Sequence, residues 1–476
     1  MKKIFVPWLI LSCLLPCYAT AAGDAPAPAP ATAAVSEAAA PLPAWLLEIQ
    51  QKKFQKPQQM LQIALAKEAE SAKWPVVLQA SYFNEIALIY EVLGRHRDQL
   101  ATAEHALALI PDAEDRTKIE LLFSIGFALE MHREYGQAND YYEKGMALAK
   151  KIADEKMQIQ GLLNLSAMLQ EEYQEQEALE MLKEAYDRAV ALQDKEMLGA
   201  VNAELGLMYT GLGSDEEARQ LLEESYRIYD ELGWEKAKIA IWYNLASTYR
   251  YINKAEQALG LFEQMLKVSL IDEDPVNLYF AYMGMATTSR QLKRIDAAVA
   301  YLEKAEIYLP HLQSTFQLSV HHFEKALIFR SLGQTSLAMQ EVNLATEQLQ
   351  SDKNVSDKFY RLHFEEFRAR LYADSGDFDK AYSTLNRFFR DYVALQDDKR
   401  DLQVQKLRLG FDAERQKAKN ELLKKDNELQ ALRLQDVERN RQIQRMWISI
   451  FAFTSLILLT LLVWQWKRRR KTLPTT

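Results

Sequence analysis

The stretch that decides the fold is ELGLMYTGLGSDEEARQLL, residues 204–222. The small residue Gly206 is followed twelve positions later by a second small residue, Ala218, and four positions after that by the bulky Leu222. Apolar residues recur at spacings of three and four, and Gly213 separates the two halves, so the stretch predicts two α-helices joined by a tight turn. The small residues would let the helices approach closely, and the bulky residue would fill the space between them.

This pattern repeats along the chain. The first small residues of successive units are Ala87, Gly126, Ser166, Gly206, Ala246, Ala286, Ala326 and Ala369, and the interval is 40 residues in five of the seven cases. The second small residues are Ala138, Ala178, Ala218, Ala258, Ala298, Ala338 and Ala381. A single hairpin cannot bury its apolar face alone, so eight stacked hairpins are predicted over residues 81–392, preceded by a cap helix at 57–73. The first unit departs from the pattern, because Gln99 stands where the returning helix should have Ala.

These units resemble tetratricopeptide repeats (TPRs) in a longer-helix form. The resemblance is carried by residues 204–213, by the sequence from Asn244 to Tyr249, and by the sequence from Ala258 to Phe262. It implies an all-α fold, a TPR solenoid over residues 45–394 with about eight repeats. In such arrays the first helix of each unit lines a concave groove.

The N-terminal 44 residues have the pattern of an export signal followed by a spacer. Residues 1–21 combine Lys2 and Lys3 with an apolar run and a small-residue exit, which is typical of a secretory signal peptide. The only two cysteines, Cys13 and Cys17, lie within it, so we expect no thiol or disulfide chemistry after cleavage. A lipid anchor at Cys17 is the less favoured alternative. Residues 22–44 are rich in Ala and Pro, and we expect them to be a linker.

The C-terminal end predicts one membrane span. Residues 446–466 contain no charged side chain, and as an α-helix they would cross a bilayer core. The basic tail at 467–476 begins with five consecutive Lys and Arg residues, which predicts a cytoplasmic C-terminus. The two ends together predict a single-pass protein of the bacterial inner membrane, with its repeats in the periplasm.

Residues 395–445 predict a long juxtamembrane helix. Leu395, Leu402 and Leu409 are seven residues apart, which favours an imperfect coiled coil and a homodimer, although a single solvated helix fits as well. Followed by the span and the arginines, this segment is similar to the linker of membrane sensors that couple periplasmic TPRs to a cytoplasmic GGDEF diguanylate cyclase. The sequence ends at Thr476, so we expect the sensor half without the cyclase domain.

Composition and motifs argue against catalysis. The net charge of -8 disfavours nucleic acid as a partner. The sequence has no Gly-rich phosphate loop, nucleophile elbow or zinc-protease motif. We therefore expect a protein that is not an enzyme and has no catalytic residue, cofactor or metal.

One set of residues suggests a binding site. With the first small residue counted as position eight of its unit, position twelve is Arg in three successive units, at Arg250, Arg290 and Arg330. The other candidates on the same helical face are Arg370, Tyr243, Ser247, Tyr251, Thr287 and Phe323. Such a ladder would suit an acidic peptide, an anionic sugar or a phosphorylated ligand. Alternatively, the arginines complement the helix dipole, a contribution of about 0.3–1 kcal/mol each, or pair with acidic neighbours.

The leading hypothesis is thus a periplasmic receptor or scaffold that binds a protein, peptide or anionic ligand in its TPR groove. It would act through a separate signalling partner, and the resemblance implies a link to cyclic-di-GMP or biofilm control. A purely structural assembly scaffold is the second hypothesis, and the truncated sensor half of a cyclase is the third.

Overall fold

The computed structural model describes residues 42–172, 174–271, 274–312, 314–350 and 356–395, together with separate residues between 424 and 446. The chain divides into two units, residues 1–404 and 405–476, and all the helices below belong to the first. The predicted signal peptide and basic tail, and nearly all of the linker and juxtamembrane helix, lie outside the described residues. No helix among the described residues is both long and apolar enough to cross a bilayer. Beyond its first residue, the predicted span at 446–466 lies outside them.

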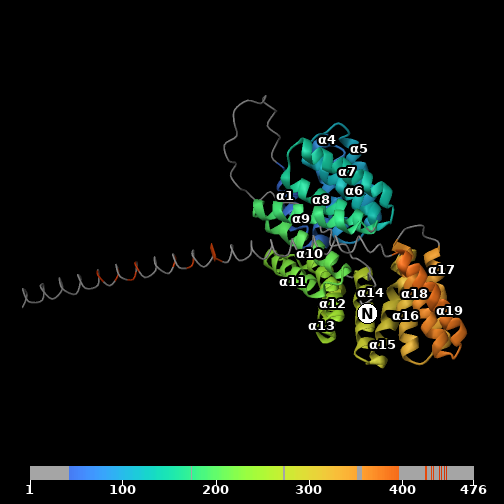
Figure 1. Cartoon of the computed structure of the whole chain (residues 1–476). Coiled ribbons are helices and arrows are strands. Elements are labelled where there is room, and N and C mark those ends of the chain that lie inside the picture. Colours follow the sequence, from blue (N-terminus) through green and yellow to red (C-terminus); the bar gives the residue numbers. More distant parts are fainter. Residues whose placement is uncertain are drawn as a thin grey trace, which may run out of the picture. The chain divides into compact units, whose positions relative to one another are not determined.

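Eight helical hairpins follow one another in the described ranges (Figure 1), which confirms the predicted all-helical solenoid. The hairpins are α4–α5 (Val76–Val92, His96–Leu109), α6–α7 (Arg116–Met131, Tyr135–Lys151), α8–α9 (Glu155–Glu171, Glu175–Leu192), α10–α11 (Lys195–Gly211, Asp215–Leu232), α12–α13 (Glu235–Tyr251, Ala255–Ile271), α14–α15 (Pro275–Gln291, Ile295–Tyr308), α16–α17 (Thr315–Ser331, Thr335–Gln350) and α18–α19 (Ser356–Asp374, Phe378–Leu395).

The repeated small residues are where the two helices of a hairpin meet. A Cβ atom added at Gly206 would lie 2.7 Å from Cγ of Leu222, and one added at Gly126 would lie 2.5 Å from the ring of Tyr142. The second small residues Ala138, Ala178, Ala218, Ala258, Ala298 and Ala338 are all fully buried. Close packing at these points is therefore what the 40-residue period encodes.

Short polar signals begin and end the helices. Asp115, Asp154, Asp194 and Asp274 are the N-caps of α6, α8, α10 and α14. Each carboxylate accepts the backbone N–H three residues further on at 3.0–3.1 Å, which satisfies a donor that the helix leaves unpaired. Gly213 and Gly333 end the first helices of their hairpins with φ of 71° and 73°, a conformation that favours glycine.

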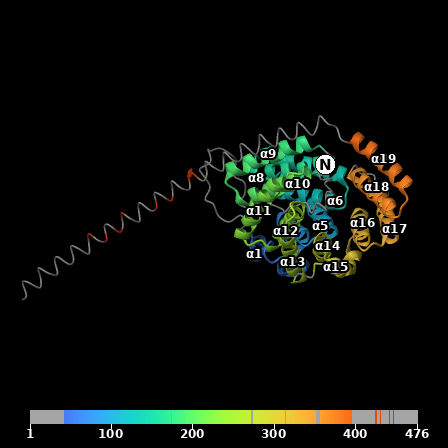
Figure 2. The same ribbon diagram turned by 60° about the horizontal axis from the view of Figure 1, so that its bottom comes forward.

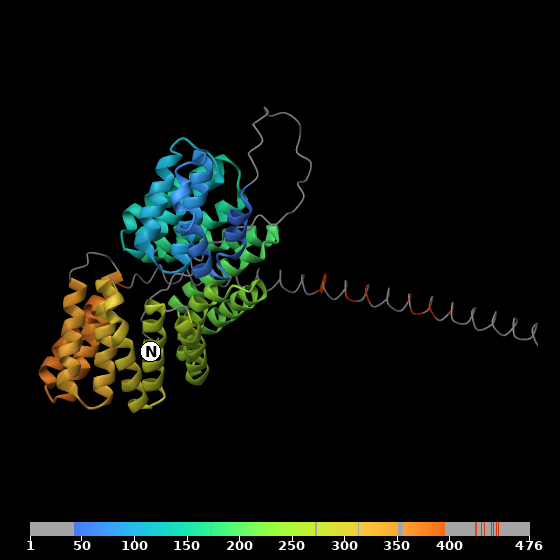
Figure 3. The ribbon, with the colours of Figure 1, turned by 180° about the vertical axis from the view of Figure 1, so that it is seen from behind.

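The first helices of the hairpins form a continuous inner layer. From α4 as far as α16, each even-numbered helix contacts the next even-numbered one, in addition to the returning helices on either side. Figure 2 and Figure 3 show the same stack of hairpins from below and from behind. The inner layer is the surface that the TPR resemblance implies should bind a ligand.

The N-terminal cap is larger than predicted. In place of one helix at 57–73 it has α2 (Pro57–Leu65) and α3 (Glu68–Ser71), and α1 (Ala44–Lys52) precedes them. Ile49 and Met60 are fully buried beside α4, where the Oη of Tyr82 donates to the carbonyl of Ala64 at 2.9 Å. This cap covers the apolar end that the first repeat would otherwise expose.

The exception at Gln99 has a physical reason. Its side chain is fully buried on α5, and its Nε2 donates to Glu91 at 2.8 Å and to the backbone carbonyl of Ser124 at 3.0 Å. A polar residue replaces Ala here because these acceptors satisfy it.

Candidate functional site

Two of the predicted arginines, Arg250 and Arg290, end neighbouring inner helices and share an acidic neighbour. Burial lowers the pKa of Arg290, and the nearby Glu324 of α16 opposes this effect. Glu324 is 1% exposed, and neither of its carboxylate oxygens has a hydrogen-bond partner among the described residues. Burial raises its pKa to about 7 even though Arg290 and Arg250 act in the opposite direction. The structure thus places two guanidinium groups and a buried carboxyl group together on the inner layer.

Arg330, the third arginine of the ladder, is held by an ion pair. Its Nε lies 2.5 Å from Oδ2 of Asp374, and its Nη2 donates to Oδ1 at 3.3 Å. Arg290, Arg330 and Asp374 also line one hollow of about 500 Å³, together with the end of α16 and the start of α17. Arg330 therefore pairs with an acidic neighbour, which is the alternative to ligand binding given by the sequence. The ion pair itself, however, forms one wall of a hollow.

Arg370 is not brought to this hollow. It is exposed on α18, and its Nε lies 2.5 Å from Glu366 of the same helix. Of the four predicted arginines, it is the one whose environment is that of an ordinary surface ion pair.

Four of the other predicted residues are used for packing. Tyr243 lies between the rings of Phe262 and Phe280, with centroids 5.9 and 5.7 Å away, and Phe323 packs on Phe364 at 4.7 Å. The hydroxyl groups of Ser247 and Thr287 are buried and donate to carbonyls of their own helices. Tyr251 is half-buried, and burial raises its pKa.

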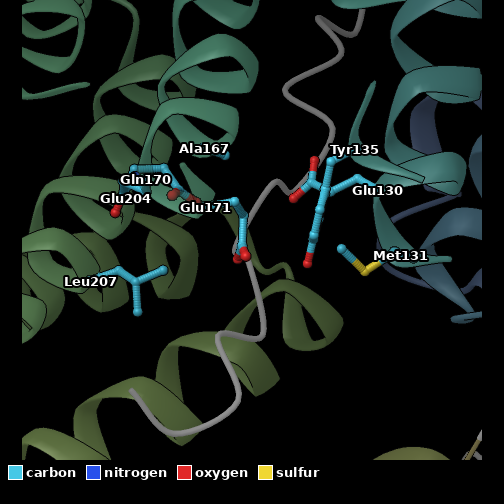
Figure 4. Close-up of a pocket in the computed structure, with 8 residues that line it drawn as sticks. All are labelled: Glu130, Met131, Tyr135, Ala167, Gln170, Glu171, Glu204 and Leu207. Carbon is cyan, nitrogen blue, oxygen red and sulfur yellow. The ribbon is translucent and has the colours of Figure 1, made fainter. Parts of the chain in front are cut away.

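Sequence reasoning missed an acidic pocket in the first half of the inner layer. The cavity has a volume of about 60 Å³. In Figure 4, Ala167, Gln170, Glu204 and Leu207 lie on one side of it, Glu130, Met131 and Tyr135 lie on the other, and Glu171 lies between. Glu204 is at position six of its repeat, as are Glu85 and Glu324. The sequence signal for this pocket was a glutamate that recurs at position six, two residues before the small packing residue at position eight.

The inner layer therefore changes its charge along its length. The helices α4 to α10 contribute buried or half-buried acidic residues at Glu85, Glu91, Glu120, Glu130, Glu171, Glu196 and Glu204. The arginines Arg250, Arg290 and Arg330 lie on α12 to α16. Within the described ranges, no three or more His, Cys, Asp or Glu side chains are grouped so as to hold a metal ion.

The corner between α1 and α2 reaches this acidic half. Lys53 is 4% exposed, and its Nζ lies 2.6 Å from Oε2 of Glu85. Burial raises the pKa values of Glu91, Glu120 and Glu196, and the charge of Lys53 opposes this effect at each of them. The next residue, Phe54, packs in an apolar cluster with residues of α4, α10, α11 and α12. The N-terminal cap thus supplies a buried cation and an aromatic ring to the inner layer.

Comparison with known proteins agrees with this architecture. Residues 203–232 and 281–306 each match the tetratricopeptide repeat family. No curated protein matches the sequence.

Solved structures give the same result at the level of the fold. A Rap protein complexed with competence and sporulation factor is similar with a TM-score of 0.51 and 16% identity, over 65% of this chain and 87% of that chain. NprR in complex with its cognate peptide NprX is similar with a TM-score of 0.50 and 16% identity, over 64% of this chain and 87% of that chain. The chain therefore contains tetratricopeptide repeats, and its described helices form a TPR-like solenoid.

Proposed function

We propose that this chain is a non-enzymatic receptor or scaffold whose inner layer captures a protein or peptide segment that carries an anionic group. The observation that carries the proposal is the environment of the Arg290 side chain. Its side chain lines the hollow shared with Arg330, and its buried Nε has no hydrogen-bond partner among the described residues. An unsatisfied buried donor is costly, so an acceptor that fills this position gains the full benefit of pairing.

The chemistry of the hollow suits a carboxylate or a phosphate. A guanidinium group presents several N–H donors in one plane, and it matches these anions with two parallel hydrogen bonds. Asp374 fixes the orientation of Arg330, so less side-chain entropy is lost when a ligand binds. The two solved complexes above support a peptide as the ligand class, because NprR is bound there to its cognate peptide and the Rap protein to competence and sporulation factor.

A binding experiment with the full chain tests this function. Fluorescently labelled acidic peptides from a library are titrated against the wild type and against a variant carrying Arg250→Ala, Arg290→Ala and Arg330→Ala. We expect the triple variant to bind at least about tenfold more weakly, since each lost charged hydrogen bond contributes about 1.5–3 kcal/mol. Arg370→Ala is the matched control and should bind as the wild type does. Equal affinities of the triple variant and the wild type, with helical circular dichroism preserved, would refute the proposal.

We propose in addition that the repeats lie in a bacterial periplasm, held by the span at 446–466 and paired through residues 395–445. This rests on the sequence patterns of segments outside the described residues. A reporter fused behind Thr476 should be active in the cytoplasm, and periplasmic activity would contradict this topology.

The identity of the partners decides between a sensor and a structural scaffold. Cross-linking followed by detergent extraction and pull-down identifies the proteins bound to the chain. Cytoplasmic signalling proteins, such as those that make cyclic-di-GMP, would favour a sensor, whereas solely periplasmic partners would favour an assembly scaffold.

A further inference from the structure

The pocket around Glu204 is the second place on the inner layer where a buried charged side chain has no hydrogen-bond partner among the described residues. Glu204 lies on α10 with 1% of its surface exposed. Both of its carboxylate oxygens lack a partner there. It lines the cavity of about 60 Å³ shown in Figure 4, so an acceptor without a partner among the described residues lies at the wall of this pocket.

The other walls of the pocket add negative charge and an apolar lining. Glu130 of α6 and Glu171 of α8 contribute two further carboxylates, and Gln170 contributes an amide. None of the lining residues is Lys, Arg or His. Met131, Ala167 and Leu207 provide apolar surface, so the pocket suits a positive group attached to a short alkyl chain.

The nearby cations of the chain contact groups other than Glu204. The guanidinium of Arg133 lies 4.4 Å from the ring centroid of Phe316 and 5.9 Å from that of the lining residue Tyr135. The Nζ of Lys156 lies 2.6 Å from Glu196. Lys53 pairs with Glu85 on α4. These side chains are therefore engaged with groups other than Glu204.

Size and geometry narrow the class of cation. A volume of about 60 Å³ is sufficient for an ammonium group, since one water molecule needs about 10–15 Å³ of such volume. Among the described residues, the carboxylates are not grouped so as to hold a metal ion. An ammonium group offers three donors on a compact centre, and the walls offer acceptors from two sides.

We propose that this pocket binds a primary ammonium group of the ligand, with Glu204 as its counter-ion. The inference deepens the proposed function and rests on it, because it assigns the cationic part of the ligand to α6–α10 and the anionic part to α12–α16. A segment bound on the inner layer would then have a fixed direction. The ammonium group belongs either to a lysine side chain or to the N-terminus of a peptide.

Calorimetric titration of the full chain with cadaverine, a small primary diamine, tests the pocket directly. We expect millimolar binding at about pH 9, where the Glu204 carboxyl group is ionised and cadaverine is still protonated. Glu204→Gln should weaken this binding by at least about tenfold, because the amide keeps the shape and removes the charge. The control is Glu263→Gln, which removes an exposed carboxylate on α13, outside both the pocket and the hollow. It should bind cadaverine as the wild type does. Equal binding by Glu204→Gln and the wild type, or no cadaverine binding by the folded wild type, would overturn the proposal.

Peptides distinguish the two sources of the ammonium group. The acidic peptides that bind are compared with versions acetylated at the N-terminus and with versions acetylated at lysine. If one of the two acetylations weakens binding to the wild type but does not weaken binding to Glu204→Gln, the acetylated group is the one that occupies the pocket. If neither acetylation weakens binding, the inference is wrong for peptide ligands.

The two proposals fail separately. A loss of peptide capture in the triple arginine variant, with no effect of Glu204→Gln on any probe, would leave the proposed function standing and remove the ammonium pocket. Cadaverine binding that depends on Glu204, together with unchanged peptide capture by the triple arginine variant, would support the ammonium pocket and refute the proposed function.

Discussion

The ring of Phe54 lies 4.6 Å from the ring of Trp234, so the N-terminal cap touches the turn that leads into α12. Both residues belong to one apolar cluster that also contains Leu88 and Tyr229. Phe54 is 4% exposed and Trp234 is 7% exposed. The contact joins segments that are four hairpins apart in the sequence, and it fixes the cap against the acidic half of the inner layer.

Replacing Phe54 with Ala should lower the free energy of unfolding by about 3–5 kcal/mol, because a buried aromatic ring is lost and a cavity remains. Urea unfolding of the full chain measures this difference. The control is Phe378→Ala, since Phe378 is 70% exposed at the start of α19 and should change the stability by less than about 0.5 kcal/mol. Equal effects of the two substitutions would mean that the Phe54 contact contributes nothing to the stability.

The adjacent Lys53 should be needed for a different reason. Lys53→Met leaves Glu85 buried without its closest cation, and breaking one side of a buried ion pair costs about 3–5 kcal/mol. Adding Glu85→Gln to Lys53→Met should restore part of this loss, because no unpaired charge is then left. A double-mutant cycle measured by urea unfolding checks the coupling. Strict additivity would show that the two charges do not depend on each other.

The repeat positions could be predicted from the sequence, whereas the site could be predicted only in part. Small residues at a fixed spacing have one packing role, so Gly126 and Gly206 are sufficient to locate their hairpins. The spacing at position twelve predicts a uniform ladder, yet Arg330 is paired with Asp374 from the following repeat. Arg370, which was predicted on the same helical face, is paired within its own helix. Partners supplied by other repeats are not visible in the spacing of one residue type.

The burial of the aromatic and acidic residues likewise depends on contacts between repeats that the sequence pattern does not show. Tyr243 and Phe323 share a helical face with the arginines, but the ring area is large enough that packing against Phe262 and Phe364 buries them. Glu204 shares repeat position six with Glu85 and Glu324, but nothing in the sequence shows that its carboxylate is buried without a hydrogen-bond partner among the described residues. Its isolation arises from the helices that meet around it, and the contact between Phe54 and Trp234 likewise depends on how the hairpins stack.

Adding one methyl group where two helices cross should lower the stability of the fold if the small residue there is required for close packing. Gly206→Ala places a Cβ atom 2.7 Å from Leu222, and overpacking of this kind costs about 1–3 kcal/mol. Gly260→Ala is the matched control, because Gly260 lies within α13 and an added Cβ atom would have no neighbour within 4 Å. It should stabilise the chain by about 0.5–1 kcal/mol, since alanine favours the helix. Thermal unfolding followed by circular dichroism should therefore move in opposite directions for the two variants.

The buried glutamates Glu204 and Glu324 should make the ligand-free protein less stable as the pH rises. Burial raises the pKa of Glu204 from its ordinary 4.5 to about 8 and that of Glu324 to about 7. Between the ordinary and the raised pKa, the unfolded chain has released a proton that the folded chain keeps. The free energy of unfolding therefore falls by about 1.4 kcal/mol per pH unit for each group in this range and levels off above the folded pKa.

The variants Glu204→Gln and Glu324→Gln each replace one of these titrating carboxyl groups with an amide that does not titrate. Each should show a shallower decline than the wild type, and the double variant should be the shallowest. The decline should extend to higher pH in Glu324→Gln, which keeps Glu204, than in Glu204→Gln. Urea unfolding at a series of pH values gives the curves, and the differences between variants cancel the contributions of Glu91, Glu120 and Glu196, whose pKa values burial also raises. Curves that run parallel to the wild type would show that both carboxyl groups are ionised in the folded protein, with partners that balance their charge.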